Sequence, residues 1–357
     1  MLFRSHAEDN PTAFHGVPQF CVEDGKIEKS AEPSFTESFS RKLLSLGGRD
    51  PRVVAITAAM AKGTGLSPFQ ESFPDRFFDV GIMEQHAVTF AAGLAAAGMR
   101  PVVALYSTFI QRAVDQVVHD VALPNLGVVF ALDRAGLVGD DGETHQGLYD
   151  MQLFRSVPNM TIMAPASGAE MDLMMDHAAE RAGPCVLRFP KDTCRLDLPE
   201  LSLPLEPGRG VFARREGGAV LILSLGGLLH QALEAADILS RRGMAADVYN
   251  LRFVKPLDAG NLAEVLSGYE AAYLVEDGAR SGGVGEMVGS LLRECAPGLL
   301  YDHGGAPDAF LPQGSREELL ADCGLDAAGI AEAVRELSGR AAAERAAGHA
   351  YHLKRVM

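Results

Sequence analysis

The feature of the sequence that most restricts its fold is a repeated alternation of short β-branched runs with longer segments of helical spacing. Runs typical of buried strands stand at residues 53–57 (VVAIT), 77–80 (FFDV) and 101–106 (PVVALY), and the spacing predicts helices over 84–98 and 109–121. Strands that alternate with helices in this way form parallel sheets with helices on their faces. The sequence therefore predicts an α/β fold.

The same alternation continues in the C-terminal part of the chain, where residues 246–254 (ADVYNLRFV) are predicted as one strand. A chain of 357 residues is long for one hydrophobic core. We therefore expect two consecutive α/β domains with mostly parallel sheets flanked by helices. The expected boundaries are 1–33 for a lead or linker segment, 34–196 for the first domain, 197–216 for a proline-containing linker, 217–340 for the second domain and 341–357 for a helical tail.

The charge of the chain bears on its partners. The net charge is −15 and the isoelectric point is near 5.1. Nucleic acids and anionic membranes bind basic surfaces that displace counterions, so neither is an expected partner. The sequence has no apolar tract long enough to span a membrane, and its N-terminus lacks the apolar centre of a signal peptide. These features predict a cytoplasmic protein.

Cysteine and histidine spacing gives no metal or disulfide pattern. The five cysteines are scattered and include no C-x-x-C pair. The ten histidines include no H-x-x-x-H spacing. We therefore expect no metal ion held by this chain alone.

Residues 77–93 (FFDVGIMEQHAVTFAAG) place a carboxylate, Glu84, in the first turn of a predicted helix after a predicted strand. Two interpretations remain open for it. An acid at a helix N-terminus complements the helix dipole. Alternatively, it is a functional group beyond the carboxyl end of a strand. On the same helix, small residues at Ala87, Ala91, Ala95 and Gly98 form a face that could allow close helix packing at an interface with a partner chain, although alanines also simply favour a helix.

Other ionisable and aromatic side chains follow the remaining predicted strands of the first domain. In open parallel sheets, ligands bind beyond the carboxyl ends of the strands. A glycine-rich loop at 133–147 is long enough to be functional and to approach a ligand closely. Together the groups suit an anionic ligand with an aromatic part and acid–base chemistry nearby. The alternative is that Arg112 and Arg188 make surface ion pairs and that Phe109 packs in the core. The side chains expected beyond the carboxyl ends of the strands, Glu84 included, are those of Glu84, Tyr106, Phe109, Arg112, Arg134, Asp141, His145, Arg188 and Lys191.

Several long motifs carry a resemblance to a known family. They include FPDRFFDVGIMEQHAVTFAAGLAAAGMRPVVALYSTFIQRAVDQVVHDVAL, DRAGLVGDDGETHQG and, further along, LRFVKPLD and PQGSREELL. With FHGVPQF near the N-terminus, they resemble the second and third domains of the 1-deoxy-D-xylulose-5-phosphate synthases, which are transketolase-type enzymes dependent on thiamine diphosphate. The resemblance runs from about residue 8 to residue 338. It implies a pyrimidine-binding domain followed by a transketolase C-terminal domain.

The resemblance implies roles for four residues in binding the cofactor. Glu84 matches the acid that hydrogen-bonds N1′ of the aminopyrimidine and helps its imino tautomer to remove the C2 proton. Phe109 matches the ring that stacks on the aminopyrimidine. Met60 is assigned to the cofactor as well, and so is Arg112, which the resemblance places in the pocket near the phosphate of the aldehyde substrate.

The resemblance also implies roles at the substrates. Groups near the phosphate of the aldehyde substrate are matched by Tyr106, Arg134 and Lys191, and the catalytic groups in addition to Glu84 are matched by His145, Asp141 and His15. His15 on its own is equally typical of a surface loop. At Lys191 the family usually has an arginine, so the bidentate fork on the phosphate is missing.

The family's first domain, with its GDG metal and diphosphate motif, has no counterpart in the sequence. The resemblance then implies that this chain binds the aminopyrimidine half of thiamine diphosphate, and that a separate subunit carries the diphosphate and Mg²⁺ in a dimer or heterotetramer. The expected reaction condenses pyruvate with glyceraldehyde 3-phosphate and releases CO₂. The alternatives are a transketolase-like subunit with another donor or acceptor, and a catalytically silent relative that only binds partners.

Overall fold

A computed structural model describes residues 8–9, 20–24, 26, 32–139 and 141–356, with side chains described up to residue 344. The chain divides into two units, Met1–Pro33 and Ser34–Met357. In the described part of the first unit, the Cys21 amide donates to the Lys26 carbonyl at 2.8 Å and Lys26 pairs with Asp24 at 2.7 Å. All further elements belong to the second unit. None of the helices in the described ranges is long and apolar enough to cross a membrane.

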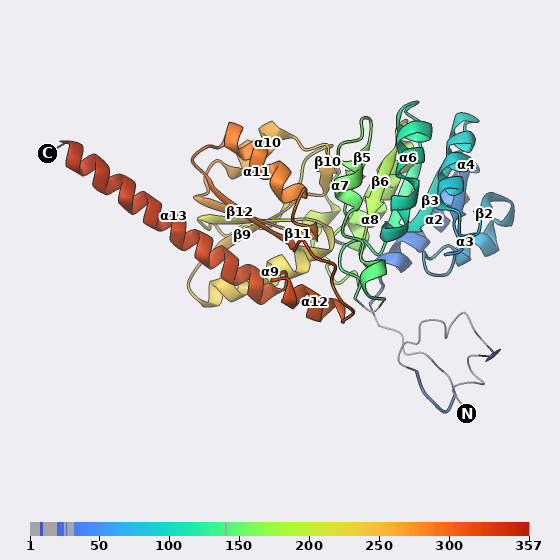
Figure 1. Ribbon diagram of the computed structural model, residues 1–357, viewed down its shortest axis with the longest axis horizontal. Helices are drawn as coiled ribbons and strands as arrows, with labels where there is room; N and C mark the ends of the chain where they lie inside the picture. Colours follow the sequence, from blue (N-terminus) through green and yellow to red (C-terminus); the bar gives the residue numbers. More distant parts are fainter. Residues whose placement is uncertain (1–7, 10–19, 25, 27–31, 140, 357) are drawn as a thin grey trace. The chain divides into compact units, whose positions relative to one another are not determined.

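The first sheet has seven strands in the order β10-β5-β6-β4-β3-β1-β2 (Figure 1). All of its pairings are parallel except that of β10 with β5. The predicted α/β class is confirmed. The strands are β1 (Val53–Thr57), β2 (Phe77–Asp79), β3 (Arg100–Tyr106), β4 (Val129–Asp133), β5 (Thr161–Met163), β6 (Cys185–Arg188) and β10 (Phe253–Lys255).

Two long helices, α2 (Phe35–Arg49) and α8 (Gly168–Glu180), contact each other and bury a common core cluster against one face of this sheet. The helix α2 begins at a capping box, in which the Ser34 side chain accepts from the Glu37 amide and the Glu37 carboxylate accepts from the Ser34 amide. The other face is covered by α4 (Glu84–Ala96) and the helical segments after β3. Shorter elements on this domain are α3 (Ser67–Ser72), η1 (Pro74–Arg76) and α7 (Asp150–Phe154).

Three predictions for this domain are wrong in detail. The strand β2 is an edge strand with partly exposed side chains, whereas a buried strand was expected. The small residues Ala87 and Ala91 are fully buried in the core of this domain, so only Ala95 and Gly98 of the predicted face are accessible to another chain. The helix predicted over 109–121 is broken into short α, 3₁₀ and π segments. These are α5 (Ser107–Ile110), η2 (Gln111–Ala113), α6 (Val114–Gln116) and η3 (Val117–Ala122).

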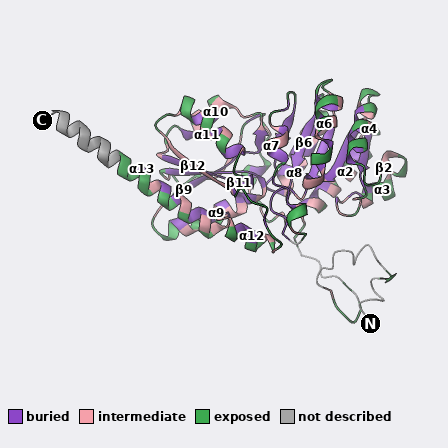
Figure 2. Ribbon diagram, viewed as in Figure 1, coloured by how far each residue is buried: buried purple, intermediate pink, exposed green. Residues whose placement is uncertain are grey.

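The second sheet has five strands in the order β12-β11-β8-β9-β7, and only the edge strand β7 is antiparallel. Its central strands are buried along their whole length (Figure 2). The strands are β7 (Val211–Arg214), β8 (Val220–Ser224), β9 (Ala246–Asn250), β11 (Ala271–Ala279) and β12 (Leu300–Ala306). The helical elements are η5 (Pro199–Ser202), η6 (Gly226–Leu228), α9 (Leu229–Arg241), α10 (Ala259–Leu266), α11 (Val284–Cys295), α12 (Arg316–Asp322) and α13 (Ala327–Val356). Both η5 and β7 fall within the range expected to be a linker.

The segment 246–254, predicted as one strand, is instead two strands that belong to different sheets. Between β9 and β10, Arg252 has a φ of +61° and turns the chain. Its side chain is fully buried, and its Nε donates to a Glu170 carboxylate oxygen at 2.6 Å. A sequence pattern that alternates correctly for a strand does not reveal such a turn.

Candidate active site at the carboxyl ends of β2, β3 and β4

Glu84 is the first residue of α4 and lies just after β2. Only 2% of its surface is exposed, although an acid that merely complements a helix dipole needs no burial. Arg112, from η2, places its Nη1 at 3.3 and 3.2 Å from the two carboxylate oxygens. The ion pair joins two segments that follow different strands, β2 and β3.

A row of aromatic rings extends from this pair. The Arg112 guanidinium carbon lies 5.4 Å from the centre of the Phe109 ring. The Phe109 ring stacks on Tyr106, with centroids 5.8 Å apart, and meets the His145 ring edge-on at 5.3 Å. Tyr106 ends β3 and Phe109 lies on α5, one helical turn further. Five predicted site residues, Glu84, Arg112, Phe109, Tyr106 and His145, are therefore contiguous.

Arg134 closes the other end of the row. Its guanidinium lies 3.9 Å from the centre of the Tyr106 ring, and its Nη1 donates to the Gly63 carbonyl at 2.6 Å. Gly63 is required for this arrangement, because a Cβ there would lie 1.8 Å from the Tyr106 hydroxyl oxygen. Burial raises the pKa of Tyr106, so its hydroxyl is a neutral donor near pH 7.

Asp133, the last residue of β4, holds Arg134 and was not singled out by the sequence. One carboxylate oxygen accepts from the Arg134 amide at 2.7 Å and the other from the Thr36 hydroxyl at 2.7 Å. Burial raises the pKa of the Asp133 carboxyl. Arg134 itself has a φ of +58°, which the neighbouring carboxylate stabilises. An acid at the end of a buried strand was the available signal.

The glycine-rich loop that follows is a closed structure. Gly136 and Gly147 exchange backbone hydrogen bonds of 2.7 and 2.8 Å at its base. Its tip carries Asp141, which is exposed, and the short 3₁₀ helix η4 (Glu143–His145). The Thr108 hydroxyl donates to the Thr144 carbonyl at 2.9 Å and so ties η4 to α5. The loop thus brings His145 onto Phe109.

The remaining predicted residues lie in other settings. Lys191 is exposed after β6, and Met60 is partly buried in the loop after β1. His15 lies outside the described residues. Arg188 was grouped with the ligand-facing cations, and this is wrong: it is buried, with its Nε at 2.9 Å from Asp150 and its Nη1 at 2.8 Å from Asp277. A cation at a strand end looks the same in sequence whether it meets a ligand or a buried acid.

A second set of residues, on the C-terminal domain, supports the loop and was also missed. The Arg316 side chain, 9% exposed, donates to the Leu137 carbonyl at 2.5 Å and pairs with Asp192 at 3.3 Å. Gly139 approaches the backbone here so closely that a Cβ would lie 2.6 Å from the Gly314 carbonyl oxygen. Arg316 stands in the motif PQGSREELL, and the only sequence signal was its position before a predicted helix.

The donor set fits one half of a thiamine-type cofactor. A partly exposed aromatic face at Phe109 beside the buried carboxylate of Glu84 suits a flat, polar ring such as an aminopyrimidine. The described side chains include no group of three or more His, Cys, Asp or Glu residues able to hold a metal ion. All five cysteines are free.

Two family models match the chain. Transketolase, pyrimidine binding domain, matches residues 31–196, and Transketolase, C-terminal domain, matches residues 210–330. The 1-deoxy-D-xylulose-5-phosphate synthase of Treponema pallidum (strain Nichols) is 50% identical over 326 residues, which are 91% of this chain and 52% of that protein. The synthase of Magnetococcus marinus is 49% identical over 337 residues, 93% of this chain and 54% of that protein. The chain spans about half the length of the curated relatives it matches.

A solved structure described as "Split gene transketolase, inactive beta4 tetramer" superposes with a TM-score of 0.76 and 32% identity. The match covers 84% of this chain and 96% of that chain. The expected resemblance to the second and third domains of the synthases is confirmed by the sequence matches. With its pyrimidine-binding and C-terminal domains, the chain belongs to the transketolase family.

Proposed function

We propose that this chain is the pyrimidine-binding part of a 1-deoxy-D-xylulose-5-phosphate synthase and works with a separate chain that binds the cofactor's diphosphate and Mg²⁺. The reaction condenses pyruvate with glyceraldehyde 3-phosphate and releases CO₂. The relatives at 50% and 49% identity carry this name, which supports the choice of reaction. The assembly is a dimer or heterotetramer, since a cofactor held between domains of two chains needs both.

The observation that carries the proposal is the buried Glu84 carboxylate beside the Phe109 ring. Thiamine diphosphate supplies a nucleophilic carbon and an electron sink when it is bound. Glu84 would hold the proton at N1′ of the aminopyrimidine, and Phe109 would cover one face of that ring. Arg112 neutralises Glu84 in this structure, so it lies where it can stabilise the carboxylate whenever the cofactor does not engage it.

The same row of residues offers a substrate site on the side away from Glu84. Arg134, with Tyr106 beneath its guanidinium, would bind the phosphate of the aldehyde, and Lys191 would add a second positive charge. His145 and Asp141, on the glycine-rich loop, would exchange protons with the part of the intermediate that comes from pyruvate. His15 belongs to the same proposal by family resemblance alone.

The need for a second chain is supported by the comparison with a solved structure. The solved split-gene relative, which this chain covers almost completely, is described as an inactive tetramer of one kind of subunit. We expect this chain to behave in the same way when it is alone.

The decisive experiment is reconstitution. The purified chain is assayed with thiamine diphosphate, Mg²⁺, pyruvate and glyceraldehyde 3-phosphate, first alone and then with a separately produced diphosphate-binding domain of a synthase. We expect turnover only in the mixture, together with a stable complex in size-exclusion chromatography. Turnover by the chain alone would contradict the split site, and a preference for another acceptor, such as an unphosphorylated aldose, would favour the transketolase-like alternative.

Glu84→Gln tests the central residue. The amide keeps the shape of the side chain but cannot exchange the proton, so we expect turnover of the reconstituted enzyme to fall at least about 100-fold, within the range typical of positioned acids and bases. Glu71→Gln is the matched control, because Glu71 is exposed on α3. Equal activity of the two variants would remove the role proposed for Glu84.

A further inference from the structure

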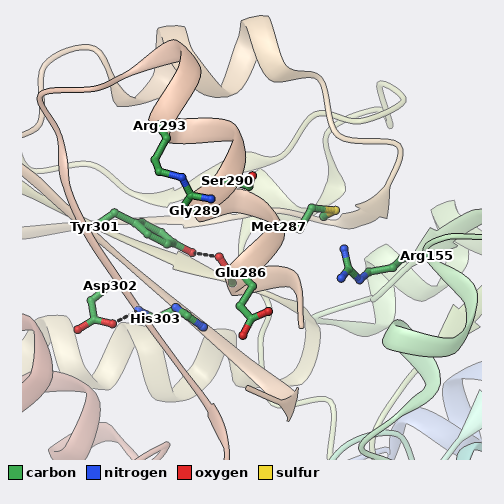
Figure 3. Close-up of a pocket in the computed structure, with 10 residues that line it drawn as sticks. Arg155, Glu286, Met287, Gly289, Ser290, Arg293, Tyr301, Asp302 and His303 are labelled. Atoms are coloured by element: carbon green, nitrogen blue, oxygen red, sulfur yellow. Dashed lines mark hydrogen bonds between the residues drawn. The ribbon is translucent and has the colours of Figure 1, made fainter. Parts of the chain in front are cut away.

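A second pocket lies on the C-terminal domain, outside the row of residues described above. It has a volume of about 780 Å³, which is within the range of small-molecule sites. Its walls come from α11, from β12 and, across the boundary between the domains, from Arg155 at the end of α7 (Figure 3). A ligand bound there would contact both domains.

The floor of the pocket is built by two glycines of α11 and two rings of β12. Gly285 and Gly289 lie one turn apart, and a Cβ on them would come within 2.2 Å of His303 and 2.9 Å of Tyr301. The two rings stack with centroids 6.1 Å apart, and the Tyr301 hydroxyl donates to the Gly285 carbonyl at 2.8 Å. The two rings thus pack against the bare backbone of α11 at these glycines.

Both carboxylates of the pocket already have partners. Glu286 accepts from the Gly282 amide at 3.0 Å. Asp302 pairs with Arg280 at 3.0 Å and accepts from the His303 amide at 2.8 Å. Arg280 thus neutralises Asp302, whereas Glu286, bonded to a backbone amide, keeps its negative charge.

The two arginines of the pocket are different. Within the described side chains, neither Arg155 nor Arg293 has an ion pair or a side-chain hydrogen bond. Figure 3 shows Arg293 beside Gly289 and Ser290 and Arg155 on the opposite side, facing the N-terminal half of α11. The His303 Nε2 atom is buried and also has no hydrogen-bond partner among these residues. Unpaired donors thus predominate in the pocket, although the net charge of the whole chain is −15.

We propose that this pocket binds a small organic phosphate that lies over Tyr301 and His303, with Arg293 on one side of the pocket and Arg155 on the other supplying the positive charge. Guanidinium groups bind phosphate oxygens through paired, charge-assisted hydrogen bonds. Ser290, also in the pocket wall, offers a hydroxyl donor. The site is independent of the proposed reaction, since it shares no residue with the Glu84 row. Because Arg155 follows α7, which directly follows the loop carrying His145, occupancy would link the C-terminal domain to that loop.

The test uses the whole chain and glycerol 3-phosphate as the probe. Binding is measured by isothermal titration calorimetry in a background that carries both Arg134→Gln and Lys191→Gln, which removes the two positive charges proposed to bind phosphate in the active site. We expect one molecule to bind per chain, and the pair Arg155→Gln with Arg293→Gln to weaken binding about tenfold or more, as expected for the loss of charged hydrogen bonds. Arg241→Gln, an exposed arginine at the end of α9, is the control and should change the affinity less than about twofold.

A second measurement locates the probe. The NMR signals of the His303 imidazole are assigned with a His303→Gln variant. They should shift on addition of glycerol 3-phosphate and should not shift in the double arginine variant. The proposal is overturned if no saturable binding occurs, if the double variant binds as well as its parent, or if lactate, a carboxylate of similar size, binds equally well. Retained thermal stability of the double variant ensures that a loss of binding is not a loss of folding.

Discussion

Glu84 is a proposed active-site residue whose burial has an energetic cost. An almost fully buried carboxylate is unfavourable unless it is paired, and here the partner is Arg112, whose guanidinium is half exposed. The position after β2, in the first turn of α4, was predictable from the sequence. The partner was not, because the spacing of 28 residues between the two follows from the arrangement of β2 and β3 in the sheet.

Lys191 gives a prediction at the residue scale. A lysine brings one point charge to a phosphate, whereas an arginine brings a planar fork of two hydrogen bonds. In the reconstituted enzyme, we expect Lys191→Arg to lower the KM for glyceraldehyde 3-phosphate severalfold and to leave the KM for pyruvate unchanged. Steady-state kinetics with each substrate varied in turn would measure this.

Lys191→Gln is the companion variant and should raise the KM for the aldehyde. If both substitutions leave that KM unchanged, Lys191 does not contact the phosphate. Arg188 shows that a cation at the end of a strand does not by itself indicate a ligand contact. It is the last residue of β6, yet its guanidinium pairs with Asp150 and Asp277 rather than with a ligand.

At the scale of elements, Glu276 on β11 caps α11. Its two carboxylate oxygens accept from the Val284 and Gly285 amides at 2.9 and 2.7 Å. The interaction resembles an N-cap supplied from a neighbouring strand. Burial nonetheless dominates and raises the pKa of Glu276 to about 7.

This pKa predicts a pH dependence of folding. The pKa of Glu276 is raised in the folded state from an ordinary value of 4.5, so its contribution to stability is full below that value and is lost as the pH rises through about 7. Relative to Glu276→Gln, the free energy of unfolding of the wild-type chain should fall by about 2 to 3 kcal/mol between pH 5 and pH 8. Urea unfolding of both proteins at several pH values measures this difference in the free energy of unfolding.

The comparison with Glu276→Gln removes the effect of all other titrating groups. The amide still accepts one of the two backbone hydrogen bonds, so the cap is weakened equally at each pH. A difference between the two proteins that stays constant from pH 5 to pH 8 would show that the buried carboxyl does not change its charge in this range.

Elements in which apolar residues recur with one clear period were predictable from the sequence. Segments in which the chain changes direction were not. The strand β1 and the helix α4 coincide with the expected segments to within about two residues. By contrast, the run 246–254 alternates like a single strand, and the turn at Arg252 depends on a buried acid on α8 that is distant in sequence. The helix after β3 is broken where Phe109 and Arg112 reach the site, and periodicity alone does not report this.

At the scale of the whole molecule, the pair of Arg252 and Glu170 joins the two sheets. Arg252 lies where the chain leaves β9 of the second sheet and enters β10 of the first sheet. Glu170 lies on α8, a helix of the first domain. Breaking a buried pair leaves an unpaired charge, so Arg252→Met or Glu170→Ala alone should lower the free energy of unfolding by about 3 to 5 kcal/mol.

The double variant should lose less free energy of unfolding than the sum of the losses of the single variants, because no charge is then left unpaired.

Calorimetry should also show one thermal unfolding transition for the wild-type chain, since the domains share β10. Two separate transitions in the wild type would contradict the coupling.

Arg316 gives the last prediction, which concerns how the C-terminal domain acts on the candidate active site. Its guanidinium contacts the Leu137 carbonyl, Asp192 and, at 3.6 Å, Asp277, and it thereby fixes the start of the loop that carries His145. Arg316→Met keeps the length of the side chain but removes these bonds. We expect faster hydrogen exchange of the backbone amides of residues 136–147 and, after reconstitution, a kcat reduced about tenfold with little change in the KM for pyruvate.

The design separates positioning from general destabilisation. Arg335→Met is the matched control, because Arg335 is exposed on α13 and, among the described side chains, its ion pair is with the neighbouring Glu332. Arg316→Lys keeps the charge and one donor, so it should restore part of the protection of the loop. If Arg316→Met lowers the stability of the chain but leaves exchange of residues 136–147 at the rate of the wild type, Arg316 merely supports packing between the domains. Faster exchange confined to that loop, partly reversed by lysine, would identify Arg316 as a positioning residue contributed by the second domain.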